Sequence, residues 1–354
     1  MVFGNVIFGV TCLEMVALIR IKDIAERAGV STTTVSNVIH QKEGKVSPAL
    51  AARIKGMIQE MGYVPSLSAR MLAKEDSHVI GVVVNCEAEE PLRSRKDLLA
   101  ASLVRYLETA IREEGYYMML FTRRSMEEVL QESRAWNFDG VIAFGITREE
   151  LERLQAAFPK PVVTIDNSLE HTYSNVCQVG TDDFGGGRQI GEYLLSQGHR
   201  KLLFVADNDQ GEDHRRWLGF REAMEAAGLT DVDSMHLLLP ADRAQRLEAY
   251  AGLLPLLRQQ TALCFCSDYH AVEAMNRLRE LGLRTPEDLS VTGFDDVVYA
   301  WVSWPNLTTV HQCMDEKARL AVEMLTDMVS GVSVENCDQK VPTYVVERDS
   351  VRPV

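Results

Sequence analysis

The sequence predicts an α/β protein in two parts, a small all-helical N-terminal module followed by a core of two doubly wound parallel-sheet subdomains. Three observations lead to this fold class. The apolar positions of residues 21–61 show only helical periodicity. From Val79 onward, strands that are apolar on both faces alternate with amphipathic helices, which is typical of buried parallel sheets. This second region is about 270 residues long, too much for one compact sheet, and therefore indicates two halves.

Charge is distributed unevenly along the 354 residues. The net charge of −14 argues, taken alone, against a partner that carries many phosphates. However, residues 18–75 contain nine basic and five acidic residues, a net charge of +4, whereas the other 28 basic and 46 acidic residues give −18. A basic module thus precedes an acidic body, and only the module is suited to nucleic acid.

The cysteines and the N-terminus indicate a cytoplasmic protein. Seven scattered cysteines without a CxxC pair favour reduced thiols over a disulfide framework or a zinc site. Cys264 and Cys266 alternate within one strand, so neither is expected to hold a metal. The apolar opening segment has no basic residue before Arg20, which does not fit a signal peptide. We interpret residues 1–17 as an N-terminal extension, with Met15 as an alternative start of the protein.

Residues 18–64 are predicted to form a helix-turn-helix module. The segments "IKDIAERA" and "STTTVSNVIH" are helical in pattern, and only Gly29 and Val30 separate them, which requires a tight turn. A third helix, "PALAARIKGMIQEM", begins after Ser47 as its cap and stops at Gly62. Residues 65–77 follow as a linker or a marginal helix.

The second of these helices has an unusual polar face. Its apolar residues fall on one side, and the other side carries only short hydrogen-bonding side chains without a carboxylate: Thr32, Thr33, Ser36, Asn37 and His40. Such side chains suit the major groove of DNA, where Thr contacts a thymine methyl group and Asn binds adenine. The alternative interpretation is a solvated polar face that contacts nothing.

Seven strands are predicted in the core. They read "VIGVVV", "YYMMLF", "DGVIAFG", "PVVTID", "KLLFVAD", "ALCFCSD" and "LSVTGFD". The segment "FGGGRQIG" lacks the GxGxxG spacing of a dinucleotide loop, so we expect a helix to start there. The sequence contains no GxSxG, HExxH or P-loop pattern, and its eight histidines form no cluster, so it offers no obvious catalytic site.

Acidic side chains stand at the ends of several predicted strands, namely Asp166, Asp268 and Asp295. In open α/β sheets, ligands bind outside the carboxyl ends of the strands. Together with Arg216 and Trp217 at a helix start, these carboxylates can hold a polyhydroxylated ligand by hydrogen bonds and stacking. The alternative is that each carboxylate caps the next helix or forms a local salt bridge.

From Arg20 to Val351 the chain resembles the LacI/GalR family of bacterial transcription regulators. The resemblance is carried by "IKDIAERAGVSTTTVSNVI", "GYVPSLSARML", "GHRKLLFVAD", "RRWLGFREAM", "DLSVTGFDD", "PNLTTV" and "VVERDSV". It implies a DNA-binding repressor under allosteric control by a small molecule, usually a sugar, with no cofactor, metal or membrane. It further implies a homodimer on a pseudo-palindromic operator, in which residues 98–111 help to form the dimer face.

The resemblance also assigns roles in DNA binding. Thr32, Thr33 and Asn37 would face base edges, and Ser31, Thr34, Ser36 and His40 would lie near phosphates. In a hinge helix within residues 65–77, Leu72 would be an apolar wedge between base pairs, and the small Ala69 would allow close approach. Asn37 stands where many members of the family have Arg, which favours adenine over guanine at that operator position.

For the core, residues 78–354, the resemblance implies a periplasmic-binding-protein-like pair of subdomains. The N-subdomain would cover residues 78–178 and 310–339, and the C-subdomain residues 179–309 and 340–351. The effector would lie between them, with Asp166, Arg216 and Asp295 as polar contacts near Trp217, Ser267 and Asp268. Ser267 stands where many members have Asn, which leaves the class of ligand open.

The sequence argues against two other functional classes. A solute-binding protein of the same core fold would need a signal sequence and no DNA-binding module. An enzyme on this core would need a nucleophile or a metal constellation, which the sequence does not offer.

Overall fold

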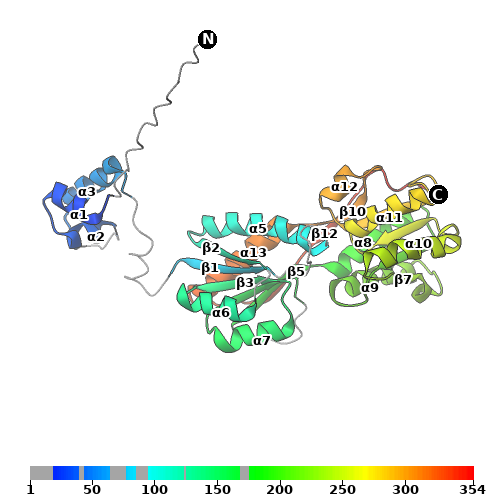
Figure 1. The fold of residues 1–354 in the computed structure, drawn as a ribbon, viewed down its shortest axis with the longest axis horizontal. Coiled ribbons are helices and arrows are strands. Elements are labelled where there is room, and N and C mark those ends of the chain that lie inside the picture. The colour runs from blue at the N-terminus through cyan, green and yellow to red at the C-terminus, as the bar shows by residue number, and fades with distance from the viewer. Residues whose placement is uncertain (1–18, 40–43, 64–76, 85–94, 123–124, 168–174) are drawn as a thin grey trace, which may run out of the picture. The chain divides into compact units, whose positions relative to one another are not determined.

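The computed structural model describes residues 19–39, 44–63, 77–84, 95–122, 125–167 and 175–354 (Figure 1). The chain divides into two compact units, Met1–Glu75 and Asp76–Val354. Each unit has its own hydrophobic core. Among the helices described in these ranges, none combines the length and the apolar character that crossing a membrane requires.

The first unit contains three short helices around a small core. They are α1 (Ile21–Ala28), α2 (Thr32–Ile39) and α3 (Pro48–Met61). Each contributes one side chain with no exposed surface, Ile24, Val35 and Ile54 respectively. Because helices of eight residues are unstable alone, this shared core is what stabilises them.

Glycines end two of these helices, as predicted. Gly29 ends α1 with φ of 67° and Gly62 ends α3 with φ of 64°, a left-handed conformation that glycine adopts without steric cost. Ser47 precedes α3 and Pro48 opens it, but the Ser47 side chain makes no capping hydrogen bond. The helix-turn-helix prediction is confirmed, apart from this cap.

A six-stranded parallel sheet, the N-sheet, forms the first half of the second unit. Its order is β11-β5-β4-β3-β1-β2. The strands are β1 (Val79–Val84), β2 (Tyr117–Thr122), β3 (Gly140–Phe144), β4 (Val162–Ile165), β5 (Val176–Thr181) and β11 (Asp338–Val341). Helices α5 (Arg95–Glu113) and α13 (Met314–Val329) pack on one face, and α6 (Met126–Ala135) and α7 (Arg148–Ala157) on the other.

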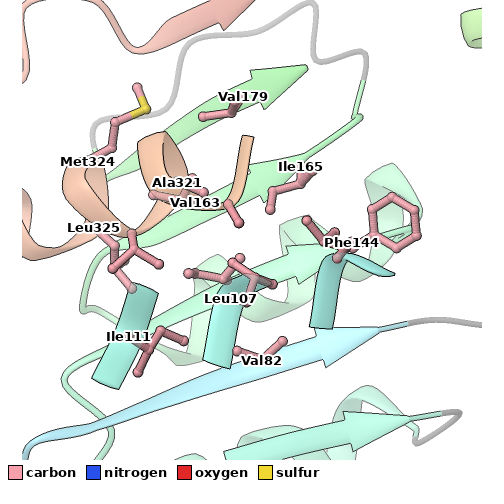
Figure 2. Packing of buried hydrophobic residues seen from close by; sticks show 14 of the residues in the cluster. Val82, Leu107, Ile111, Phe144, Val163, Ile165, Val179, Ala321, Met324 and Leu325 are labelled. Atoms are coloured by element: carbon pink, nitrogen blue, oxygen red, sulfur yellow. The ribbon is translucent and has the colours of Figure 1, made fainter. Parts of the chain in front are cut away.

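Figure 2 shows the core between the N-sheet and the helices α5 and α13. Leu107 of α5 and Leu325 of α13 point toward strand residues such as Val82 and Val163. All four side chains are at most 1% exposed. Burial of each contributes about 1.5–3 kcal/mol, so this face fixes the first half of the unit.

A second six-stranded sheet, the C-sheet, has the order β12-β10-β9-β8-β6-β7. Its strands are β6 (Leu202–Ala206), β7 (His236–Leu238), β8 (Ala262–Phe265), β9 (Ser290–Asp295), β10 (Thr308–Gln312) and β12 (Thr343–Val346). Only the β10–β12 pair is antiparallel. The helices around it are α8 (Asp183–Ser196), α9 (Gly211–Ala226), α10 (Arg243–Leu257), α11 (Asp268–Glu280), α12 (Val298–Val302) and the 3₁₀ turn η1 (Val232–Met235).

The chain passes between the two sheets three times. It crosses after Thr181 from β5 to α8, after Gln312 from β10 to α13, and after Val341 from β11 to β12. The subdomain bounds expected at about 178, 309 and 339 lie within three residues of these crossings, which are at the ends of β5, β10 and β11.

Two glycines bring α8 and α9 into close contact. A Cβ atom on Gly187 would lie 2.0 Å from the Arg216 backbone oxygen, and one on Gly219 would lie 1.9 Å from the Phe184 oxygen. Asp182 caps α8 by accepting a hydrogen bond from the Gly185 N–H at 2.9 Å. The predicted helix start at "FGGGRQIG" is therefore confirmed, and its glycines serve helix packing.

The expectation of reduced thiols is wrong for one pair. Cys177 and Cys337 form a disulfide with Cα atoms 4.4 Å apart, although 160 residues separate them. The two cysteines meet because β5 and β11 pair in parallel, with Gln178 beside Asp338. Their spacing in the sequence gives no hint of this contact.

Candidate functional site

The polar face of α2 is presented on the outside of the three-helix module. Val35 and Val38 turn inward, with 0% and 4% of their surface exposed. Thr32 and Thr33 are exposed, and Ser36 and Asn37 are half-buried. We call Thr32, Thr33, Ser36 and Asn37 the α2 face. It is an uncharged surface of hydroxyl, methyl and amide groups supported by a packed core.

Ser31 and Thr34 hold the start of α2 together. The Ser31 hydroxyl oxygen accepts a hydrogen bond from the Thr34 N–H at 3.1 Å and lies 2.9 Å from the Thr34 hydroxyl. This contact satisfies a backbone donor that the first turn of a helix leaves unpaired. Thr34 therefore has a structural role. His40, Ala69 and Leu72 lie outside the described residues.

Basic side chains are exposed on the same module. They are Arg20, Lys22, Arg27, Lys45, Arg53 and Lys55. Two of them face acidic partners at the surface, Lys22 at 3.7 Å from Glu26 and Arg27 at 3.6 Å from Glu60. Such exposed pairs are weak, so these cations can exchange partners for phosphate groups.

In the second unit, Arg216 is the centre of a buried charged cluster. Its side chain lies in α9 and is 2% exposed. The Nε atom donates to Asp183 Oδ1 at 2.8 Å, and an Nη atom donates to Asp295 Oδ1 at 3.3 Å and to the Cys266 oxygen at 2.7 Å. The guanidinium carbon lies 3.7 Å from the centre of the Phe294 ring. Elements α8, α9 and β9 therefore meet at one cation.

This cluster holds more negative than positive charge. Asp213 is a third carboxylate, 3.8 Å from the Arg216 guanidinium. We call Arg216, Asp183, Asp213 and Asp295 the Arg216 cluster. Burial raises the pKa of Asp183 to about 6 even though Arg216 lowers it. A surplus of buried carboxylate favours ligands that donate hydrogen bonds, such as hydroxyl groups.

A chain of hydrogen bonds leads from the Arg216 cluster to the N-sheet. Gln312 donates through Nε2 to Asp295 Oδ1 at 2.6 Å. Its Oε1 accepts from the Thr181 hydroxyl at 2.6 Å and from Lys317 Nζ at 2.9 Å. Lys317, which is fully buried in α13, also donates to Asp166 Oδ2 at 2.6 Å. Thr181 and Gln312 are the last residues before two of the points where the chain passes from one sheet to the other. These hydrogen bonds therefore join the two subdomains.

Asp268 and Ser267 are buried and engaged by the protein itself. Asp268 accepts hydrogen bonds from the Thr309 hydroxyl and from the Val297 N–H, the latter at 2.9 Å. Burial raises the pKa of Asp268 well above its usual range. Ser267 caps α11 by accepting from the His270 N–H at 3.4 Å. Both residues fit the structural alternative, in which a strand-end side chain caps or braces its neighbours.

Trp217 does not lie with these polar groups. It is 4% exposed, stacks on the His236 ring with centres 4.4 Å apart, and packs against Phe204 and Phe220. Because neighbouring residues of a helix point in different directions, Arg216 reaches the strand ends while Trp217 enters the core. The expected stacking of Trp217 on a ligand stays a prediction, since in the structure its ring stacks on His236 instead.

Sequence reasoning missed Asp183, Gln312, Lys317 and Thr181. For Lys317 a signal exists, because it shares the buried face of α13 with Ala321 and Leu325, and a lysine on an apolar face needs a buried partner. For Gln312 no local signal exists, because its contact with Thr181 spans 131 residues.

A pocket of about 290 Å³ lies elsewhere in the second unit, among residues of α10, α11 and α12. It is lined in part by Arg243, Tyr269, Glu273, Asn276, Arg277 and Tyr299. None of the six residues expected to contact an effector lines it. Of those six residues, Arg216 and Asp295 lie in the Arg216 cluster, and Asp166 is connected to it through Lys317 and Gln312.

Comparison with known proteins matches two parts of the chain to known families. Residues 20–66 match the family of bacterial regulatory proteins of the lacI type, and residues 192–351 match a periplasmic binding protein-like domain. The first match lies over the three-helix module and decides against a solute-binding protein. It also gives the function class of the relatives, which are regulators and not enzymes.

Several curated proteins and solved structures are similar over most of the chain. The transcriptional repressor PurR of Haemophilus influenzae (strain PittEE) is 31% identical over 317 residues, covering 88% of this chain and 91% of PurR. The transcriptional regulator CelR of Thermobifida fusca is 29% identical over 332 residues, covering 92% and 96%. The structure of a CelR–cellobiose complex matches with TM-score 0.68 and 27% identity, covering 94% of this chain and 99% of that one.

The lac repressor dimer bound to operator and the anti-inducer ONPF matches with TM-score 0.75 over 94% of this chain and 99% of that one. At 22% identity, this match supports the fold alone. The identity with PurR over nearly the whole length establishes more than the fold. The chain belongs to the lacI family of bacterial regulatory proteins.

Proposed function

We propose that the protein is a cytoplasmic transcriptional repressor that binds a pseudo-palindromic DNA operator as a homodimer and responds to a carbohydrate effector. The observation that carries this proposal is the α2 face, an uncharged polar surface on a basic module. The membership of the protein in the lacI family supports the same function.

In the DNA complex, Thr32, Thr33 and Asn37 contact base edges in the major groove. Ser31, Thr34, Ser36 and His40 lie near phosphates, where their small polar groups fix the register of the helix. The exposed positions of Thr32 and Thr33 support the first assignment. The Ser31–Thr34 contact leaves hydroxyl oxygens at the start of α2, where backbone N–H groups also favour a phosphate.

The effector binds beside the Arg216 cluster, with Asp166, Arg216 and Asp295 as its polar contacts. Two relatives support a carbohydrate: CelR has been solved with cellobiose, and another relative, 28% identical, is named the ribose operon repressor of Escherichia coli. The surplus of carboxylates in the cluster supports a ligand that donates hydrogen bonds.

Coupling to DNA runs through the bonds that join the subdomains. A ligand that competes for Gln312 or Lys317 changes how the N-sheet and the C-sheet are held together at the crossings. Residues 65–77, of which the structure describes only Ser77, connect this change to the three-helix module. Helix α5 contributes to the dimer face. Its residues Leu103, Leu107 and Ile111 are buried against the N-sheet, so the outward-facing residues of the helix contact the partner subunit.

One experiment tests operator binding through the wedge. With Leu72→Ala, specific operator affinity and DNA bending fall, while nonspecific binding at low salt survives, because phosphate contacts are unchanged. Fluorescence anisotropy on specific and random duplexes, with a bending assay, measures both. Equal loss of both kinds of binding would overturn the role of Leu72.

A second experiment tests the effector. Thermal unfolding is measured with cellobiose, ribose and other mono- and disaccharides, and one of them raises the transition temperature of the wild type. Asp295→Asn keeps the shape of the side chain but removes its charge, and it abolishes that shift. The matched control is Asp296→Asn, because the neighbouring Asp296 is bonded to His311 and Arg348, which lie outside the Arg216 cluster. An unchanged shift in Asp295→Asn would count against the site.

A further inference from the structure

Three side chains with different metal-binding atoms meet at one edge of the C-sheet. Asp207 follows β6 and Cys266 follows β8, and these two strands are neighbours. The Cys266 N–H donates to the Val205 oxygen at 3.0 Å, which fixes the two strand ends side by side. His270 stands in the first turn of α11, one turn beyond Cys266. The topology thus brings a thiol, an imidazole and a carboxylate together from three elements.

The three donor groups lie close enough together to share one ion. The Cys266 sulfur lies 3.7 Å from His270 Nδ1, the ring nitrogen that would bind the ion, and Asp207 Oδ2 lies 3.6 Å from the other ring nitrogen, Nε2. One donor atom from each residue lies within 4.8 Å of the other two. A tetrahedral zinc ion with Zn–S of about 2.3 Å and Zn–N of about 2.0 Å separates sulfur and nitrogen by about 3.5 Å. The thiol and the imidazole therefore stand about one tetrahedral edge apart.

The neighbouring residues support these three side chains. Asn208 Nδ2 donates to Asp207 Oδ1 at 3.0 Å, which leaves the Oδ2 atom of Asp207 facing His270. The Ser267 hydroxyl lies 3.0 Å from His270 Nδ1 and offers a further oxygen. Such contacts orient ligands in metal sites.

Charge and access also favour a cation. Three more acidic residues lie in the loop that contains Asp207 and in the first turn of α9, namely Asp209, Glu212 and Asp213, of which Asp209 faces His214 and Asp213 faces Arg216. Cys266 has no exposed surface, and its sulfur lies at the N-terminus of α11, where the positive end of the helix stabilises a thiolate. The Asp207 side chain is 22% exposed, so an ion can enter from solvent past this carboxylate.

We propose that Cys266, His270 and Asp207 bind a divalent ion of the zinc class. A thiolate with an imidazole selects zinc or cobalt over magnesium and calcium, which prefer oxygen ligands alone. The fourth position is open to water or to the Ser267 hydroxyl. The ion borders the Arg216 cluster, because Arg216 donates to the backbone oxygen of Cys266. Cys266, His270 and Asp207 are not among the residues proposed as polar contacts of DNA or of the sugar.

Cobalt titration of the metal-free full-length protein tests the site. Tetrahedral cobalt bound to a thiolate has a sulfur-to-metal absorption band, and we expect this band to saturate at one equivalent and to disappear on adding zinc. Cys266→Ser loses the band, and His270→Asn lowers the affinity at least tenfold. Asp207→Asn weakens binding but keeps the band, because the thiolate is still present.

Cys313→Ser is the control, since Cys313 is a partly exposed thiol outside this group. It keeps the band and the affinity of the wild type. Circular dichroism without metal shows whether each variant is folded. An unchanged band in Cys266→Ser, or a folded wild-type protein without any thiolate–cobalt band, would overturn the proposal and would indicate a hydrogen-bonded thiol, imidazole and carboxylate instead. Operator binding measured on the same samples distinguishes this outcome from failure of the proposed repressor function.

Discussion

The α2 face and the Arg216 cluster are built in opposite ways. The α2 face consists of short, uncharged, mostly exposed side chains on a module whose core lies beneath them. The Arg216 cluster consists of buried charges that join α8, α9 and β9. DNA specificity can therefore change in this protein at little cost in stability, whereas a change in the Arg216 cluster alters folding and ligand binding together.

The largest expected effect is that of Arg216→Ala. It leaves Asp183 and Asp295 buried without their cation, so the free energy of unfolding falls by about 3–5 kcal/mol. Urea denaturation of the full-length protein measures the change. Arg221→Ala is the control in the same helix, since Arg221 is 40% exposed and its pair with Glu225 contributes at most about 1 kcal/mol. Equal losses in the two variants would refute a buried cluster.

The second effect is a pH dependence. Because burial raises the pKa of Asp183 to about 6, the folded state holds this proton more tightly than the unfolded state. Protonated Asp183 therefore contributes fully to the free energy of unfolding below pH about 4. This contribution, on the order of 3 kcal/mol, is lost as the pH rises through about 6. Asp183→Asn removes this decline, which unfolding curves between pH 4 and pH 7 will show.

The pKa of Asp296 is shifted in the opposite direction to that of Asp183. Burial alone would raise its pKa, but hydrogen bonds from His311, Trp301 and Arg348 outweigh burial and lower the pKa to about 2. Its contribution is present above pH about 4 and is lost as the pH falls through about 2. Asp296→Asn thus changes the pH dependence only in the acid range. If both variants have pH profiles parallel to that of the wild type, the assigned charge states are wrong.

A smaller effect comes from the helix contact that holds Arg216 in place. Gly187→Ala puts a methyl group 2.0 Å from the Arg216 oxygen and separates α8 from α9, so we expect a loss of about 1–3 kcal/mol in thermal or urea unfolding. Gly252 in α10 has no atom within 4 Å of the added methyl group. Gly252→Ala is expected to stabilise by about 0.5–1 kcal/mol. A destabilised Gly252→Ala, or a neutral Gly187→Ala, would contradict this packing.

The smallest effect on stability is expected at the α2 face. Asn37→Ala changes the free energy of unfolding by no more than about 0.5 kcal/mol, because the residue contributes little to the core. Operator affinity falls by about 1–3 kcal/mol through the lost contact to a base. Val35→Ala, on the buried side of the same helix, shows the reverse pattern. A stability loss in Asn37→Ala that matches its loss of affinity would indicate a structural role.

Strands with an apolar run could be predicted from the sequence, but strands with many polar residues could not. In β1 every residue is apolar or glycine and buried, so the run indicates the burial directly, and the edge strand β2 was predicted from a similar run. The central strands β5 and β10 were not predicted, because polar residues interrupt VCQVGT and TTVHQ although both strands are mostly buried. In β7, β11 and β12 at least two residues of each strand are partly or fully exposed, so their sequences read as ordinary loops. The three-helix module was predictable because helix periodicity, the caps and the turn glycine are all local features.

The candidate site shows the same limit. Asp166, Arg216 and Asp295 were expected together from the family resemblance, and hydrogen bonds through Gln312 and Lys317 do link them, although Asp166 follows β4 of the N-sheet and Asp295 ends β9 of the C-sheet. The direction of Trp217 and the pairing of Cys177 with Cys337 depend on packing between distant elements. No pattern within one element carries that information.

Selection of operators from a random duplex pool shows whether the α2 face reads DNA sequence. The wild-type protein should enrich a pseudo-palindromic site, and Asn37→Arg should enrich a site that differs at one symmetric pair of positions, with guanine in place of adenine. Identical sites from both proteins, or no enriched site from the wild type, would contradict this role of the α2 face.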